Sequence, residues 1–182
     1  MATDVVRVSK FLSLILRHEP QKIGLTLDEQ GWAEVEDLVR QANQNGQRLT
    51  RDILDRVVAQ NDKKRFAFSE DGKRIRASQG HSIEVDLALA PLAPPELLYH
   101  GTATRVVDAI RVQGLDKRER QHVHLSLDTE TARKVGQRHG KPIILVVRAR
   151  DMFQAGHQFF LSANGVWLTD RVPVEFLVFP TE

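Results

Sequence analysis

The chain has 182 residues, enough for one large domain or two small lobes. Hydrophobic residues make up 41% of it and charged residues 27%, a globular composition that argues against disordered, collagen-like and coiled-coil proteins. No apolar run approaches the roughly 20 residues that span a bilayer, and the N-terminus has no apolar core like that of a signal peptide. The absence of cysteine excludes disulfides, thiol catalysis and thiolate metal sites. We therefore expect a cytoplasmic protein without a membrane partner.

Charge is distributed unevenly along the chain. Lys plus Arg total 26 and Asp plus Glu total 24, so the formal net charge is only +2. Residues 63–82 carry six basic and two acidic side chains, and residues 105–150 carry eleven basic and five acidic ones. Two basic concentrations in a nearly neutral chain favour anionic ligands over general coating of a polyanion, and a solvated charged surface is the alternative.

The first half of the sequence predicts three helices followed by a β-hairpin. Apolar residues at helical spacing indicate the first helix, which Pro20 ends, and Asp71-Gly72 is a hairpin signal. The predicted helices cover residues 4–17, residues 34–42 and a segment capped by Thr50, and the predicted strands cover residues 65–69 and 73–77. This order is that of a winged helix, a fold that often binds nucleic acid, although fold alone does not assign function.

The second half is predicted to be rich in strands. Three of the seven prolines lie in residues 90–95, so we expect a stiff linker over residues 91–96 between lobes 1–90 and 97–182. Residues 143–147 are apolar on both faces and predict a central strand. The other predicted strands cover residues 97–101, 123–127, 159–162, 166–169 and 175–179, with helices over 105–113 and 128–139. The pattern predicts an α+β protein.

Two polar clusters lie in the first lobe. Arg17 and His18 end the first helix, where a cation simply complements the negative end of the helix dipole. Arg74 and Arg76 share one face of a predicted strand that runs into the polar segment 78–82. Arginine matches phosphate oxygens bidentately, so this segment indicates a phosphate-contacting loop, with a charged wing and a polar turn as the alternative.

Two further clusters lie in the second lobe. Alternation places His122, His124 and Ser126 on one strand face, together with the arginines at 118 and 120. This face can line a cleft, hold structural histidines or bind zinc, and the lack of cysteine and of a third ligand argues against zinc. Residues 99–102 end an apolar strand in Gly101-Thr102, where a ligand can approach the backbone. The sequence contains no P-loop, dinucleotide fingerprint or nucleophile elbow.

Several short stretches, taken together and in their order along the chain, resemble motifs of the RNA 2′-phosphotransferases, the tRNA 2′-phosphotransferase family. The stretches span about 160 residues, and each is weak alone while the ordered set is specific. They are Ser9-Lys10-Phe11-Leu12-Ser13, Leu16-Arg17-His18, Ile23-Gly24-Leu25, Gly31-Trp32, Ile75-Arg76-Ala77-Ser78-Gln79-Gly80-His81-Ser82, Tyr99-His100-Gly101-Thr102, His122-Val123-His124-Leu125-Ser126, Gly136-Gln137-Arg138-His139-Gly140-Lys141-Pro142 and Asn164-Gly165-Val166-Trp167-Leu168-Thr169.

The resemblance implies an N-terminal winged-helix lobe and a C-terminal lobe like that of the ADP-ribosyltransferases, which holds NAD as a co-substrate. It implies removal of an internal 2′-phosphate from a tRNA-like RNA. We expect a monomer. The 2′-phosphate attacks C1″ of the nicotinamide ribose and expels nicotinamide, giving a 2′-phospho-ADP-ribosylated RNA. Transesterification by O2″ then yields 2′-hydroxyl RNA and ADP-ribose 1″,2″-cyclic phosphate. No metal is required by this scheme.

The resemblance also implies residue roles. The catalytic set would be Arg17, His18, Arg76 and Arg120, the first three clamping the 2′-phosphate and Arg120 acting in transesterification, with Arg118 nearby as a competing match. Residues implied to bind the cofactor are His100, Gly101, Thr102, His124, Ser126, Arg138, His139 and Val166. Residues implied to bind RNA or its phosphate are Lys10, Ser78, Gln79, His81 and Ser82.

The broader ADP-ribosyltransferase class has a triad of site residues, and His100 and His124 resemble its first and second positions. Many members of the class place a glutamate at the third position. The corresponding stretch here, residues 164–167, contains no acid. A phosphate nucleophile is already ionised at pH 7 and needs no general base. The departure argues against a protein ADP-ribosyltransferase. The other alternative is a non-catalytic winged-helix nucleic-acid-binding protein that senses NAD.

Overall fold

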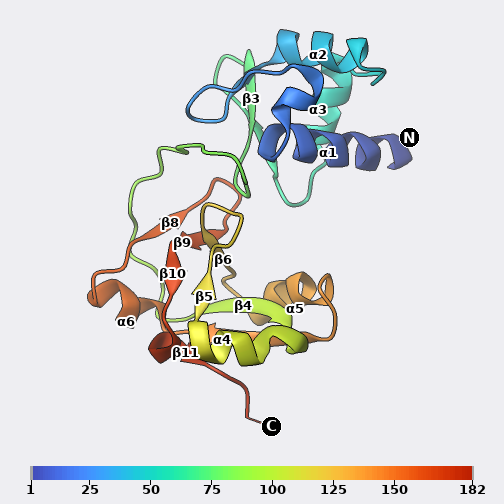
Figure 1. Cartoon of the computed structure of the whole chain (residues 1–182). Coiled ribbons are helices and arrows are strands. Elements are labelled where there is room, and N and C mark those ends of the chain that lie inside the picture. The colour runs from blue at the N-terminus through green and yellow to red at the C-terminus, as the bar shows by residue number, and fades with distance from the viewer. Residues whose placement is uncertain (1, 182) are drawn as a thin grey trace. The chain divides into compact units, whose positions relative to one another are not determined.

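The computed structural model describes residues 2–181 and divides into two compact units, unit 1 over residues 1–88 and unit 2 over residues 89–182 (Figure 1). Each unit combines helices with small antiparallel sheets, so the predicted α+β class is confirmed. The winged-helix and ADP-ribosyltransferase-like descriptions are finer than this class and stay predictions. Within residues 2–181, no helix has both the length and the apolar character needed to cross a membrane.

Unit 1 consists of three α-helices, one short 3-10 helix and a three-stranded antiparallel sheet in the order β1-β3-β2. Its elements are α1 (Ala2–Arg17), the short helix η1 (Pro20–Ile23), β1 (Ala33–Glu34), α2 (Val35–Gln44), α3 (Arg51–Ala59), β2 (Phe66–Phe68) and β3 (Arg74–Ala77). The predicted hairpin is confirmed, because Phe66 pairs with Ala77 and Phe68 pairs with Ile75. The sequence did not predict β1, since two residues are too few to show a strand period.

Local sequence explains where the helices of unit 1 begin and end. The apolar side of α1, which includes Leu12, Ile15 and Leu16, is buried in the core. Pro20 cannot continue this helix and instead begins η1. The side chain of Thr50 accepts a hydrogen bond from the Ile53 backbone N–H and caps α3 as predicted.

Unit 2 is built from several small antiparallel sheets. Its elements are β4 (Leu98–Ala103), η2 (Thr104–Val106), α4 (Val107–Gln113), β5 (Leu115–Asp116), β6 (Val123–Leu125), α5 (Thr129–Gln137), β7 (Pro142–Val147), α6 (Ala149–Gln154), β8 (Phe159–Leu161), β9 (Trp167–Thr169), β10 (Arg171–Val172), η3 (Val174–Phe176) and β11 (Leu177–Val178). The sheets have the orders β11-β7-β4, β6-β9-β8 and β10-β5. The prediction of a central strand is confirmed, because β7 lies between β11 and β4.

Some predicted elements of unit 2 were wrong. Arg118 and Arg120 were placed on a strand, but they lie in a turn before β6, closed by a hydrogen bond from the Arg120 N–H to the Lys117 carbonyl. Arg118 there has a left-handed φ of +54°, which a strand does not accommodate. The predicted strand over residues 175–179 is shorter, because the chain first forms η3.

The proline-containing segment that was predicted as a linker lies in unit 2. The Leu92 N–H donates to the Phe159 carbonyl, and the Arg150 N–H donates to the Glu96 carbonyl. Pro94 is buried. The segment therefore packs on unit 2 instead of running free of it, and the boundary between the units falls at residues 88 and 89.

A histidine is buried in unit 1. His81 follows β3 and is only 1% exposed, and neither of its ring nitrogens has a hydrogen-bond partner among residues 2–181. Burial lowers the pKa of His81 to about 4, and the positive charges of Arg17, Arg76 and His18 act in the same direction. The imidazole is therefore neutral at neutral pH, and its protonation opposes folding.

A glycine allows α5 to pack closely on β4. An ideal β-carbon at Gly101 would lie 1.6 Å from the carbonyl oxygen of Ala132, far inside van der Waals contact. Gly136 approaches β4 from the same helix, with its own β-carbon position 2.8 Å from the Thr102 carbonyl oxygen. Gly101 is thus required by helix packing, whatever its role toward a ligand.

We expect Gly101→Ala to destabilise unit 2 by more than about 3 kcal/mol, because the backbone of α5 would have to move. Thermal unfolding followed by circular dichroism measures the effect. Gly165→Ala is the matched control, since a β-carbon there meets no atom within 4 Å and adds only the cost of its positive φ, about 1–2 kcal/mol. Equal losses in the two variants would contradict the packing argument.

We expect unit 1 to lose stability as the pH falls from about 6.5 to about 4. In this interval the unfolded chain binds a proton at His81 that the folded chain does not, so the free energy of unfolding falls by about 3 kcal/mol in total. Urea denaturation followed by Trp32 fluorescence in a Trp167→Phe background reports on unit 1 alone, because the chain has two tryptophans. His81→Gln should remove most of this pH dependence, and an equally steep loss in that variant would refute the prediction.

Candidate functional site

The loop after β3 packs against the C-terminal end of α1. The Ser82 N–H donates to the Arg17 carbonyl at 2.9 Å, and His18 Nδ1 shares a hydrogen bond of 2.8 Å with Ser82 Oγ. Gly80 has a φ of +88°, and a β-carbon there would lie 3.5 Å from the Arg17 guanidinium carbon. Three of the predicted site residues are therefore brought together by contacts between segments that lie more than 60 residues apart.

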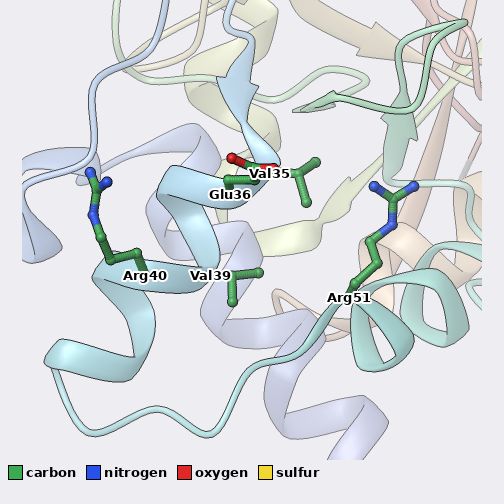
Figure 2. Close-up of a pocket in the computed structure, with 5 residues that line it drawn as sticks. All are labelled: Val35, Glu36, Val39, Arg40 and Arg51. Atoms are coloured by element: carbon green, nitrogen blue, oxygen red, sulfur yellow. The ribbon is translucent and has the colours of Figure 1, made fainter.

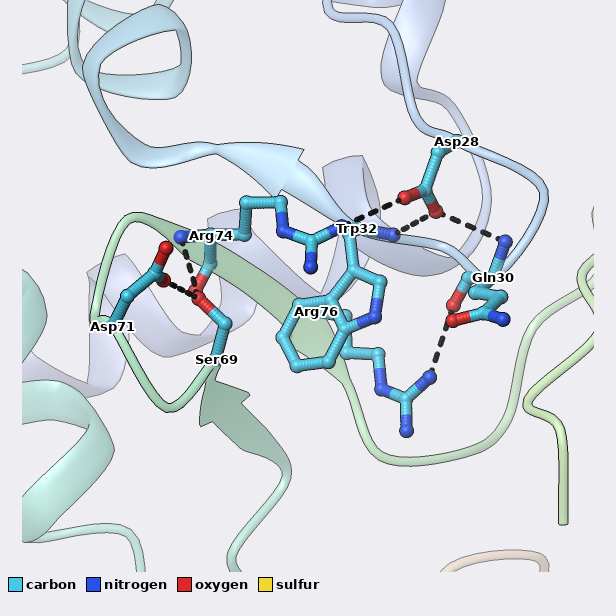
Figure 3. Close-up of polar contacts among 7 residues, drawn as sticks. All are labelled: Asp28, Gln30, Trp32, Ser69, Asp71, Arg74 and Arg76. Atoms are coloured by element: carbon cyan, nitrogen blue, oxygen red, sulfur yellow. Dashed lines mark hydrogen bonds and ion pairs between the residues drawn. The ribbon is translucent and has the colours of Figure 1, made fainter.

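Arg76 reaches the same region from β3. Ile75 and Ala77 of this strand are buried in the core while Arg74 and Arg76 occupy the other face, as the alternation predicted. The Arg76 guanidinium donates from Nη1 to the Gln30 carbonyl at 3.3 Å (Figure 3). Its carbon lies 4.4 Å from the ring centre of Trp32. Burial lowers the pKa of Arg76, but an arginine side chain stays charged in a folded protein.

The charges of Arg17, His18 and Arg76 all act on the His81 ring. We call these four residues, Arg17, His18, Arg76 and His81, the Arg17 cluster. Gln79 lies in the loop after β3, and its side-chain oxygen, which can only accept, is buried without a hydrogen-bond partner among residues 2–181. The guanidinium and imidazole N–H groups of the cluster are the donors that suit an anionic ligand.

The other residues predicted for unit 1 differ in their surroundings. Ser78 is 5% exposed, and its hydroxyl donates to the Lys64 carbonyl at 2.9 Å, so it supports the neighbouring loop. Lys10 is exposed on α1. It lies seven residues before Arg17, which places both on one side of the helix about two turns apart. No contact recorded within residues 2–181 joins Lys10 to the Arg17 cluster.

A hollow of about 400 Å³ is lined by residues of α2 and by the first residue of α3, and none of them is a predicted site residue (Figure 2). Its lining consists of Val35, Glu36, Val39, Arg40 and Arg51. The two arginines already have acidic partners, Asp37 for Arg40 and Asp55 for Arg51. The hollow therefore offers less to an anion than the Arg17 cluster does.

In unit 2, β4 and β6 are joined by a short antiparallel bridge. The backbones of Tyr99 and Ser126 exchange hydrogen bonds of 2.8 and 2.9 Å. This bridge places His100 beside His124, and His100 Nδ1 donates to the His124 carbonyl at 3.0 Å. Burial is the main cause that lowers the pKa of His100, so its ring is neutral at neutral pH.

The hydrogen bonds of the two histidines assign them opposite tautomers. A carbonyl can only accept, so His100 carries its proton on Nδ1 and leaves Nε2 as an acceptor. Arginine can only donate, so the contact of 3.2 Å between Arg120 Nη1 and His124 Nδ1 makes that nitrogen an acceptor and places the His124 proton on Nε2. The Nε2 atoms of the pair thus offer one acceptor and one donor. The contact with His124 Nδ1 also distinguishes Arg120 from Arg118.

The remaining residues predicted for unit 2 differ in how closely they are associated with His100 and His124. His139 is close enough for its charge to act on His100, as do Arg118 and Arg120. Arg138 is the exposed residue that caps α5, and no contact recorded for residues 2–181 joins it to His100. The Val166 N–H donates to Ser162 Oγ in the turn between β8 and β9. Thr102 is 9% exposed.

Sequence reasoning missed three residues that contact the Arg17 cluster. Gln30 and Trp32 contact Arg76, and a β-carbon at Gly31 would lie 3.4 Å from His81 Nε2. The only signal for them was the pair Gly31-Trp32 among the stretches that resemble the family. Residues 2–181 contain no group of three or more His, Asp or Glu side chains placed to hold a metal ion.

Comparison with known proteins shows which family this chain belongs to. A family model described as "RNA 2′-phosphotransferase, Tpt1 / KptA family" matches residues 3–171. A probable RNA 2′-phosphotransferase of Rhodopirellula baltica is 57% identical over 179 residues, covering 98% of this chain and 97% of the relative. A probable RNA 2′-phosphotransferase of Flavobacterium johnsoniae is 56% identical, and the match covers 94% of each chain. One of Escherichia coli O9:H4 is 54% identical, and the match covers 96% of this chain and 95% of the relative. The chain belongs to the RNA 2′-phosphotransferase family.

Proposed function

We propose that this protein removes an internal 2′-phosphate from RNA and uses NAD as a co-substrate. The observation that carries the proposal is the Arg17 cluster, in which Arg17, His18 and Arg76 are near enough for their charges to act on the buried, neutral imidazole of His81. A 2′-phosphate carries up to two negative charges and several acceptor oxygens. Two arginines and a histidine supply the charge and the N–H donors that such a group needs.

Structural roles explain only part of the cluster. A cation at the end of α1 is expected from the helix dipole alone, which accounts for Arg17 or His18. The dipole gives no reason for Arg76 to come from β3 to the same place, nor for His81 to be buried without hydrogen-bond partners. An anionic ligand accounts for both features, because it would offset the repulsion between the cations and satisfy buried N–H groups.

The residues of unit 2 fit the NAD role that the family resemblance implies. The Nε2 atom of His100 accepts and that of His124 donates, which matches the hydroxyl groups and amide of a nicotinamide nucleotide. Arg138 and His139 would supply positive charge for its pyrophosphate. Bound NAD would supply a ribose carbon with a good leaving group.

The proposed reaction has two steps. An oxygen of the RNA 2′-phosphate forms a bond to C1″ of the nicotinamide ribose while the bond to the nicotinamide nitrogen breaks, giving a 2′-phospho-ADP-ribosylated RNA. Ribose O2″ then attacks the phosphorus, and the bond from phosphorus to RNA O2′ breaks. The proton of O2″ passes to O2′, so the products are 2′-hydroxyl RNA and ADP-ribose 1″,2″-cyclic phosphate.

The chain's own residues would act mainly by binding and orienting. The phosphate is ionised at pH 7, so the first step needs no general base. Arg17 and Arg76 would hold the charged phosphate in place, and the family resemblance assigns Arg120 a part in the second step. His18 donates to a phosphate oxygen through its ring. The role of Arg120 in this scheme comes from the family resemblance.

We expect Arg76→Lys to lower kcat/KM by about 100-fold, because lysine keeps the charge but not the planar bidentate geometry. Arg17→Ala should lower it at least as much. The assay uses a short RNA with one internal 2′-phosphate, with and without NAD, and mass spectrometry of RNA, nicotinamide and the cyclic phosphate. Arg51→Lys is the control, since Arg51 lies in the same unit but outside the cluster.

The outcome separates the proposal from the binding-module alternative. A non-catalytic nucleic-acid binder would show no NAD-dependent loss of phosphate, and Arg76→Lys would weaken its RNA binding only modestly because lysine still neutralises a phosphate. Unchanged turnover in both Arg17→Ala and Arg76→Lys would refute the assignment of the Arg17 cluster.

We expect Arg120→Ala to slow the second step more than the first, so that phospho-ADP-ribosylated RNA accumulates. Arg118→Ala is a closely matched control, since it removes the same charge from the same turn without the contact to His124. It should change turnover by less than about threefold. Rapid-quench samples resolved by gel and mass spectrometry follow both steps, and accumulation in the Arg118 variant alone would reverse the assignment.

A further inference from the structure

A short turn before β1 is held rigidly by one carboxylate. Asp28 Oδ1 accepts hydrogen bonds from the N–H groups of Gln30 and Trp32, both at 2.9 Å (Figure 3). The Asp28 N–H donates to the Trp32 carbonyl, and the Gly31 N–H donates to the Asp28 carbonyl. Gly31 has a φ of +81°, which favours glycine. The turn closes on itself through four hydrogen bonds.

The turn is also fixed to β3. The second oxygen of the Asp28 carboxylate pairs with the Arg74 guanidinium at 3.3 Å. Directly after Trp32 the chain forms β1, which pairs with β3 through Ala33 and Ile75. Trp32 therefore stands on a backbone held from both sides, next to the strand that carries Arg76.

Two contacts from this turn restrain the Arg76 guanidinium. The Gln30 carbonyl accepts one of its N–H groups at 3.3 Å, and the guanidinium carbon lies 4.4 Å from the centre of the Trp32 ring. A planar cation on an aromatic face loses freedom to rotate, while its other N–H groups stay available at the edge of the plane. The turn also passes close to His81, since a β-carbon added at Gly31 would lie 3.4 Å from His81 Nε2.

We propose that Trp32 is a positioning residue, which holds the guanidinium of Arg76 in the orientation in which it binds the RNA phosphate. The inference rests on the proposed function, because that function is what assigns binding of the RNA 2′-phosphate to Arg76. Trp32 acts through Arg76 and not on the reacting atoms. Stacking of an RNA base on Trp32 is a different role for the same ring, and it predicts different results.

A double-mutant cycle tests the inference. kcat/KM is measured with 2′-phosphorylated RNA and NAD for the wild-type chain, Trp32→Leu, Arg76→Lys and the double variant. We expect Trp32→Leu to cost about 30-fold and Trp32→Phe less than about threefold, since phenylalanine keeps a ring face. The double variant should fall no more than about threefold below Arg76→Lys, because a residue that acts through Arg76 has nothing left to orient. Losses that multiply would overturn the inference.

A matched control and a change of substrate separate structural and base-stacking roles. Phe68→Leu removes the ring beneath another arginine of unit 1, Arg51, at 4.5 Å, and should change kcat/KM by less than threefold. A loss in Phe68→Leu as large as that in Trp32→Leu would overturn the inference. The loss of kcat/KM in Trp32→Leu is also compared between RNAs that have a purine and RNAs that have a pyrimidine beside the phosphate. A difference of more than tenfold would overturn the inference, because that dependence is expected of base stacking.

A measurement without turnover separates this inference from the proposed function. In the wild-type chain the ring current of Trp32 should displace the side-chain N–H resonances of Arg76, and Trp32→Leu should abolish the displacement. Absence of the displacement in the wild-type chain would overturn the inference whatever the activity. A displacement in a wild-type chain that fails to remove the 2′-phosphate would instead overturn the proposed function.

Discussion

Hydrogen bonds between the end of α1 and the loop after β3 hold together groups whose charges repel. The Ser82 backbone donates to the Arg17 carbonyl, and the Ser82 hydroxyl bonds to His18. The negative end of the α1 dipole offsets part of the repulsion at this place. A helix C-terminus by itself repels anions, but with Arg17 and Arg76 added it becomes attractive to them. The arrangement depends on the loop, because its residues also bring His81 into the cluster.

Each unit combines cationic side chains with neutral imidazoles. His81 is kept uncharged by burial and by its positive neighbours, so it adds a donor and an acceptor without adding to the repulsion. In unit 2, a backbone carbonyl sets the tautomer of His100, and Arg120 sets that of His124. The common principle is preorganisation: donors and acceptors are oriented by the fold before any ligand is bound. The cost in unit 1 is a buried imidazole whose protonation opposes folding.

Most helices and the longer strands could be predicted because their signals are local. The apolar period of α1, the Thr50 cap and the two-sided apolar run of β7 depend on residues near one another in the sequence. The failures have equally physical causes. Two-residue strands such as β1 are stabilised by their partner strand and not by their own sequence. The turn that holds Arg120 directly precedes a segment that alternates like a strand, but the left-handed backbone of Arg118 prevents the strand from extending back to it.

The sequence by itself determined which chemical groups are present and that their order resembles one family, and it placed Arg17 and His18 at a helix end. It also placed Arg76 on the polar face of its strand, since alternation is a local property. Only the tertiary structure decided that these groups meet around His81, that Trp32 lies under Arg76, and that Gly101 is needed for helix packing. The physical reason is that distances between residues far apart in sequence, and the pKa values and tautomers that follow from them, depend on long-range packing that no local pattern encodes.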